Sequence, residues 1–146
     1  MNYHLFNRAS GAVVISDNGE QLFLKETVKG NVVENSYYPV PEEEIQHIVT
    51  TINEIYAHYK ADGFDEVYFS FLPNPATILQ PQGYNQLIPR IEHHPGLQAP
   101  LISMYQPFLK AGKRIFRPGD THWNNEGLQI WLSAVNKVLV QHNETH

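Results

Sequence analysis

Residues 41–73 read PEEEIQHIVTTINEIYAHYKADGFDEVYFSFLP, and this stretch decides which fold the sequence predicts. Pro41 suits the start of a helix because its missing N–H costs nothing there, and the three glutamates after it favour the positive end of the helix dipole. Apolar residues then recur at steps of three and four, which predicts a helix over residues 42–62 that ends near Gly63. Its apolar face consists of Ile45, Ile48, Val49, Ile52, Ile55, Tyr56 and Tyr59.

Residues 66–72, EVYFSFL, follow this helix as a short and almost continuously apolar run. Such a run is typical of a strand that is buried on both faces and runs parallel to its neighbours. Pro73-Asn74-Pro75 ends the strand, and loops at the carboxyl ends of parallel strands are where α/β folds place ligand groups. Asn74 therefore has two interpretations, a donor to a substrate oxyanion or an Asx turn beside two prolines.

Shorter patterns predict the remaining elements. A β-hairpin is expected over residues 12–24, because Asn18-Gly19 suits a tight turn between two apolar runs. Residues 83–93 are weakly helical with an interruption at Pro89, and residues 105–111 form a helical turn. Short strands are expected at 101–102 and 115–117. Asn124 is typical of the N-cap of a last helix. The buried stripe of that helix is Leu128, Trp131, Ala134, Val135, Val138 and Leu139.

The length of 146 residues and the apolar content of 42% suit one domain, 1–146, with a core of its own. The formal net charge of -5 and the lack of a basic stripe argue against a nucleic-acid partner. The chain has no Cys, which excludes disulfides, thiolate metal sites and a Cys nucleophile. No apolar run approaches the roughly 18 residues of a membrane span, and residues 1–4 do not begin a signal peptide, so the compartment stays open. We expect no cofactor.

Asp120 and His122 are the main catalytic candidates. They lie in an expected loop between a strand and a helix, and a His that acts as a base needs a carboxylate to hold its tautomer. The alternative is that Asp120 caps the turn and His122 is a surface residue. Trp123 beside them either walls a pocket or anchors the last helix.

A Ser nucleophile is not recognisable in the sequence. None of the serines lies in a Gly-x-Ser-x-Gly or Gly-Asp-Ser motif. These serines are Ser10, Ser16, Ser36, Ser70, Ser103 and Ser133. The residues alone therefore predict half of a catalytic triad.

Asp120-Thr121-His122-Trp123-Asn124, followed by Gly127 and a helix, resembles the Asp-x-His-Trp motif of the AlgX/AlgJ-type SGNH hydrolase-like family. The order of the upstream elements agrees, from Ser10-Gly11 and the hairpin to the helix, strand and Pro-Asn loop, so the resemblance runs from about residue 8 to 140. The chain departs from the family at Pro75, where Lys is expected, and at Leu79, where Tyr is expected.

This resemblance implies an α/β fold: a flavodoxin-like, three-layer α/β/α sandwich with a mostly parallel sheet, here incomplete. It implies an O-acetyltransferase or acetylesterase acting on polysaccharide in the cell envelope, with His122 as general base and Asp120 as its partner. Asn74 and Trp123 are the expected substrate-binding residues. The family's Ser nucleophile lies downstream of Asp-x-His, so we expect the Ser to come from outside these 146 residues. An incomplete sheet would expose an edge, which a homodimer would cover.

Two other functions stay open. A non-catalytic carbohydrate-binding domain would use aromatic side chains as platforms for sugar. Its candidates are Tyr37, Tyr38, Tyr84, Tyr105 and Trp123. A metal-dependent hydrolase would combine His93 or His94 with Asp120 and His122.

Overall fold

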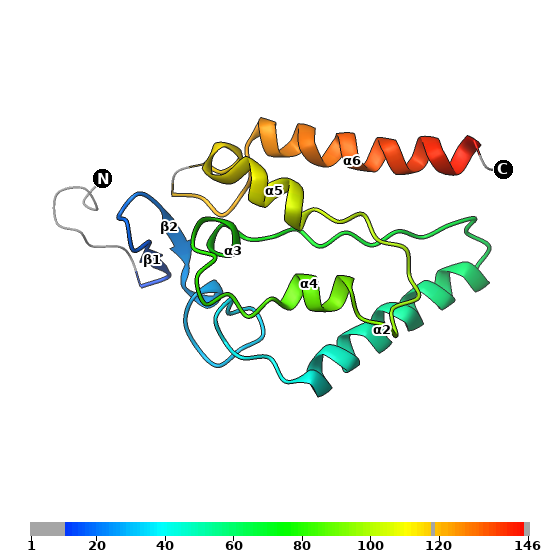
Figure 1. The fold of residues 1–146 in the computed structure, drawn as a ribbon, viewed down its shortest axis with the longest axis horizontal. Coiled ribbons are helices and arrows are strands. Elements are labelled where there is room, and N and C mark those ends of the chain that lie inside the picture. The colour runs from blue at the N-terminus through cyan, green and yellow to red at the C-terminus, as the bar shows by residue number, and fades with distance from the viewer. Residues whose placement is uncertain (1–10, 118, 145–146) are drawn as a thin grey trace.

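The computed structural model describes residues 11–117 and 119–144, and these form five α-helices and one two-stranded antiparallel sheet (Figure 1). The strands are β1 (Val13–Ile15) and β2 (Leu22–Leu24). The α-helices are α2 (Glu42–Ala61), α3 (Pro75–Leu79), α4 (Leu87–Glu92), α5 (Tyr105–Ala111) and α6 (Asn125–Glu144). Two 3₁₀ turns, η1 (Lys25–Thr27) and η2 (Gly112–Ile115), complete the described elements.

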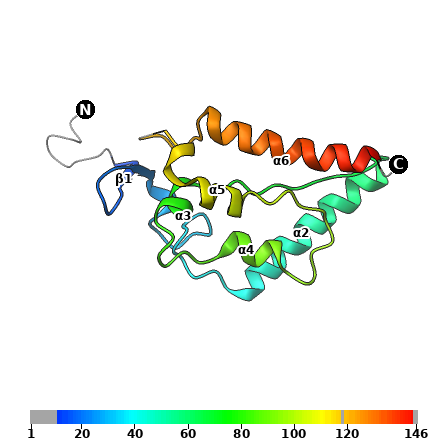
Figure 2. The ribbon, with the colours of Figure 1, turned by 45° about the horizontal axis from the view of Figure 1, so that its top comes forward.

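The predicted fold class is wrong. A flavodoxin-like sandwich needs a mostly parallel sheet, but the sheet of the described chain is the β1–β2 hairpin. Residues 66–72 do run extended between α2 on one side and α6 on the other (Figures 1 and 2). They meet residues 98–102 at a single parallel bridge between Phe69 and Leu101 and do not form a strand.

The side chains beside this bridge explain why no ladder forms. Phe69 N–H donates to Pro100 O at 3.0 Å, and Ile102 N–H donates to Phe69 O at 2.8 Å, as in a parallel pair. The preceding ladder bond would need an N–H at position 100, which proline lacks. The following one would use the carbonyl of Ile102, which instead accepts the Ser70 hydroxyl at 2.9 Å. The parallel pairing is therefore interrupted on both sides of Phe69.

The three strongest local patterns are confirmed. Helix α2 begins at Glu42 and buries Ile45, Val49 and Ile52, as the apolar spacing predicts. The hairpin pairs β1 with β2 through a turn in which Gly19 has a φ of +74°. Asn124 precedes α6, and its Oδ1 accepts the N–H groups of Glu126 at 2.9 Å and Gly127 at 3.2 Å.

Two shorter predictions need correction. Residues 115–117 do not form a strand, because η2 extends to Ile115 and Phe116 makes only one antiparallel bridge, to Trp123. The helix expected at 83–93 is limited to α4, which begins at Leu87. Pro89 lies in the first turn of α4, where a missing N–H leaves no helical hydrogen bond unmade.

The core consists of two apolar clusters, one on each side of the extended segments. One joins α5, η2 and the inner face of α6, and the other joins α2 to α4. Phe71 packs against both, so the extended run 66–72 connects them. Burial of one large aliphatic side chain contributes about 1.5–3 kcal/mol, so Ile45 and Val49, each 0% exposed, make α2 integral to the fold.

Candidate functional site

A tight loop between η2 and α6 holds Asp120 and His122. Its two ends are joined by the Phe116–Trp123 bridge and by the hydrogen bond from Asn124 N–H to Ile115 O, at 2.7 Å. Inside the loop, Asp120 N–H donates to Arg117 O at 3.2 Å. The chain reverses through Gly119, whose φ of +76° is accessible to glycine at little cost.

Asp120 and His122 interact directly, which fits both the catalytic and the turn-capping interpretation of their spacing, and the His122 side chain is 77% exposed. His122 Nδ1 lies 2.5 Å from Asp120 Oδ1, and the same oxygen accepts the backbone N–H of His122 at 3.0 Å. The backbone hydrogen bond, followed by the bond to the ring, lowers the pKa of the Asp120 carboxyl below its ordinary value. The carboxylate therefore stays ionised and favours the tautomer with the proton on Nδ1, which leaves Nε2 free to accept a proton.

His122 borders an apolar pocket of about 310 Å³ that opens to solvent. The pocket is built by segments far apart in the sequence, so no local pattern indicates it. Its lining residues are Leu24, Thr27, Leu72, Pro73, Asn74, Phe108, Phe116, Thr121, His122 and Trp123. Three of the four residues proposed from the sequence, Asn74, His122 and Trp123, line the pocket. The fourth, Asp120, contacts Nδ1 of the His122 ring.

Asn74 takes the second of the two roles considered for it, the Asx turn. Its Oδ1 accepts the backbone N–H of Thr77 at 3.1 Å, which caps α3 as an Asx turn would. Its Nδ2 donates to the Ser36 hydroxyl at 3.1 Å. An amide nitrogen has two N–H donors, so one remains after the bond to Ser36. These contacts position Asn74 in the pocket wall.

Trp123 serves both of its expected roles. Its ring lies 5.4 Å from that of Phe108 and 6.0 Å from that of Trp131, measured between centroids. It therefore anchors the start of α6 to the core while forming one wall of the pocket.

Four of the described serines form side-chain hydrogen bonds: Ser16, Ser36, Ser70 and Ser103. Ser36 is 4% exposed and bonds to Asn74, and Ser103 donates to Glu92 at 2.8 Å. Ser16 lies in the hairpin turn, Ser133 is exposed on α6, and Ser10 lies outside the described residues. No described serine lines the pocket, where the hydroxyl groups are those of Thr27 and Thr121.

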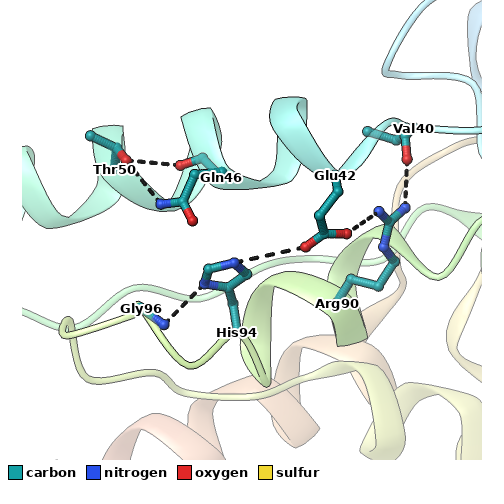
Figure 3. A network of polar contacts seen from close by, with 7 residues as sticks. All are labelled: Val40, Glu42, Gln46, Thr50, Arg90, His94 and Gly96. Atoms are coloured by element: carbon teal, nitrogen blue, oxygen red, sulfur yellow. Dashed lines mark hydrogen bonds and ion pairs between the residues drawn. The ribbon is translucent and has the colours of Figure 1, made fainter.

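His93 and His94 lie in a different environment. His94 Nδ1 accepts the N–H of Gly96 at 3.0 Å, and its Nε2 lies 3.8 Å from the Glu42 carboxylate (Figure 3). The same carboxylate binds Arg90 at 2.8 Å, so this network joins the start of α2 to α4. Within the described ranges, no group of three or more His, Cys, Asp or Glu side chains is placed to hold a metal ion. The structure therefore does not bring together the residues of the metal-hydrolase hypothesis.

Most of the aromatic candidates for sugar binding are used in packing. Tyr84 and Tyr105 are 7% and 5% exposed, and their rings lie 5.7 Å apart. The Tyr37 hydroxyl donates to Gln80 O at 2.9 Å and is half-buried. Trp123 is the aromatic candidate that lines the pocket beside His122.

None of the helices in the described part of the chain has the length and apolar character that crossing a membrane requires. Comparison with protein-family models, with curated proteins and with solved structures finds no match.

Proposed function

We propose that this chain carries the general-base side of an acyl-transfer site for O-acetylated carbohydrate, with His122 as the base and Asp120 as the residue that positions it. The observation that carries the proposal is the 2.5 Å contact between His122 Nδ1 and Asp120 Oδ1 at the border of an apolar pocket. The Asp-x-His-Trp resemblance supports the same assignment.

In the proposed reaction, His122 Nε2 takes the proton of a nucleophilic hydroxyl as its oxygen attacks the ester carbonyl. The ester C–O bond then breaks, and the imidazolium returns the proton to the leaving alkoxide. Asp120 stabilises the imidazolium between these steps. The remaining N–H of Asn74 is the donor we assign to the carbonyl oxygen, and the wall around Trp123 receives the acyl methyl group.

The reaction needs a nucleophilic hydroxyl, and no described serine lines the pocket. As the Asp-x-His-Trp resemblance implies, we propose that a Ser from outside these 146 residues acts as the nucleophile. The isolated chain should then bind an acetyl ester without turning it over.

Two measurements test this proposal. With a small acetyl ester, the chain is expected to show no hydrolysis that depends on His122. Turnover that is lost in His122→Ala and kept in His58→Ala, an exposed His on α2, would overturn the external nucleophile.

The substrate class is tested by NMR titration with an O-acetylated oligosaccharide, using the same saccharide after de-O-acetylation as the control. We expect the acetylated form alone to shift the indole N–H resonance of Trp123 and the amide of His122. Equal shifts with both saccharides would instead support non-catalytic carbohydrate binding, and no shift with either would exclude both substrates.

A further inference from the structure

The extended run 66–72 has one paired edge and one unpaired edge. Phe69 directs its N–H and C=O toward residues 100 and 102. Along an extended chain these groups alternate in direction, so Tyr68, Ser70 and Leu72 direct theirs to the opposite edge. Within residues 11–117 and 119–144, the backbone groups of these three residues have no hydrogen-bond partner. Such an edge is a template for pairing with another strand.

Helix α2 leaves an apolar flank uncovered on the side of that edge. The Asn53 side chain bonds to Gly96 O at 2.8 Å and to Gln98 N at 2.9 Å, so this flank of α2 faces the segment that continues into the Phe69 bridge. Ile55 is two residues after Asn53, which corresponds to a rotation of about 200° around the helix axis. Ile55 therefore lies on the opposite flank of α2. Ile55 and Tyr59, one turn apart there, are 40% and 42% exposed.

Helix α6 shows the same asymmetry on the other side of the extended run. Ile130 and Ala134 pack into the core on one flank. Leu128 and Leu139, which the sequence predicts in the buried stripe, instead border the core-packed Val135 at the other edge of this face and are 38% and 45% exposed. Leu72, at the end of the run itself, is 50% exposed. The unpaired edge thus lies between two helices that both expose apolar side chains.

We propose that a second copy of this chain covers this surface, pairing its own residues 66–72 antiparallel to the first across a twofold axis. The occupant must offer an unpaired backbone edge and apolar side chains on both faces, because a helix flanks each face. The sequence EVYFSFL has both properties, and one twofold rotation satisfies both edges at once. Glu66 is the single charged residue of the run, and antiparallel pairing places the two Glu66 side chains at opposite ends.

The oligomeric state tests the proposal. Light scattering and sedimentation equilibrium should give twice the chain mass of 16.8 kDa, with dissociation on dilution. Ile55→Lys should shift the protein to the monomer, because it places a charge on the buried flank. Ala57→Lys is the matched control, since Ala57 is exposed on the other flank of α2 and gains the same charge. Circular dichroism should show the same helix content for both variants.

Hydrogen exchange locates the contact. In the wild-type dimer, the amides of Tyr68, Ser70 and Leu72 should exchange more slowly as protein concentration rises, and Ile55→Lys should remove this protection. A wild-type chain that stays monomeric at high concentration would overturn the proposal. So would a dimer in which these amides remain unprotected, or one that Ala57→Lys dissociates as strongly as Ile55→Lys. Leu72 lies on both this surface and the pocket wall, but Ile55 does not line the pocket, so the outcome of Ile55→Lys is distinct from the test of the acyl-transfer proposal at His122.

Discussion

Trp123 lies against Gly127 at the start of α6, where a Cβ added to Gly127 would come 2.8 Å from the Cβ of Trp123. The same atom would also approach the carbonyl oxygen of Ile115 at 3.2 Å. Only a glycine at this position lets α6 begin so close to the loop that precedes it. The contact fixes where Trp123 stands in the pocket wall beside His122.

Gly127→Ala should destabilise the protein although alanine is the better helix former. The helical preference of alanine is worth about 1 kcal/mol, whereas overpacking against atoms of a rigid core costs about 1–3 kcal/mol. We expect a net decrease in the free energy of unfolding, measured with urea, together with a changed Trp fluorescence. Ser133→Ala, at an exposed position of the same helix, is the control and should be close to neutral or slightly stabilising. An alanine variant as stable as wild type would show that Trp123 can move away.

Asn124→Ala should lower the free energy of unfolding by about 1–2 kcal/mol. The substitution leaves the N–H groups of Glu126 and Gly127 without their side-chain acceptor and removes the bond from Asn124 Nδ2 to Arg114 O, at 2.6 Å. Asn124→Asp keeps the acceptor and should recover most of the loss. Asn125→Ala, at the exposed next residue, should change stability by less than about 0.5 kcal/mol. Equal effects at 124 and 125 would be inconsistent with a specific cap.

The pKa of Asp120 predicts an acid-dependent loss of stability. Because hydrogen bonds from His122 lower this pKa in the folded chain, the stabilisation is fully present above the ordinary value of 3.8 and is lost as pH falls through the folded value. Asp120→Asn should remove this part of the pH dependence in urea unfolding measured from neutral to acidic pH. Asp65→Asn, which removes an exposed carboxylate from another loop, is the control. Identical acid profiles for wild type and Asp120→Asn would argue against the pair.

The network around Glu42 predicts two effects of different size. The Glu42 side chain is 71% exposed, so Glu42→Gln should lower the free energy of unfolding by at most about 1 kcal/mol, and by less at high salt. Arg90→Ala should lower the free energy of unfolding by about 1–3 kcal/mol at low and high salt alike, because Arg90 Nη1 donates to the carbonyl of buried Val40 at 2.7 Å. Urea unfolding at low and high salt separates the two. A salt-sensitive Arg90→Ala effect would mean that the ion pair dominates.

Sequence reasoning succeeded where the relevant contacts are local. Apolar residues at steps of three and four predict helix α2. Asn124 predicts the cap of α6, because the N–H groups that its side chain accepts belong to residues only two and three positions later. The contact between Asp120 and His122 belongs to the same class, because residues two apart in a tight loop need no distant segment to bring them together.

Features that depend on residues far apart in the sequence were predicted wrongly. The apolar run 66–72 is consistent with a parallel strand, but Pro100 and the Ser70 hydroxyl interrupt its pairing with a segment about thirty residues later. Pro100 precedes the expected strand at 101–102, and its missing N–H indicates that a continuous parallel ladder cannot form there. Tyr84 and Tyr105, suggested as platforms for sugar, are buried because Tyr84, in the loop before α4, packs against Tyr105 in α5.

The sequence by itself determined the positions of the hairpin and the long helices, and the pairing of Asp120 with His122, since periodicity and spacing act within a few residues. Only the tertiary structure decided that Asn74 and Trp123 share a pocket with His122, and that 66–72 keeps an unpaired edge. Those features arise from the packing of segments far apart in the chain, whose side chains must fit together before a pocket or a free edge exists.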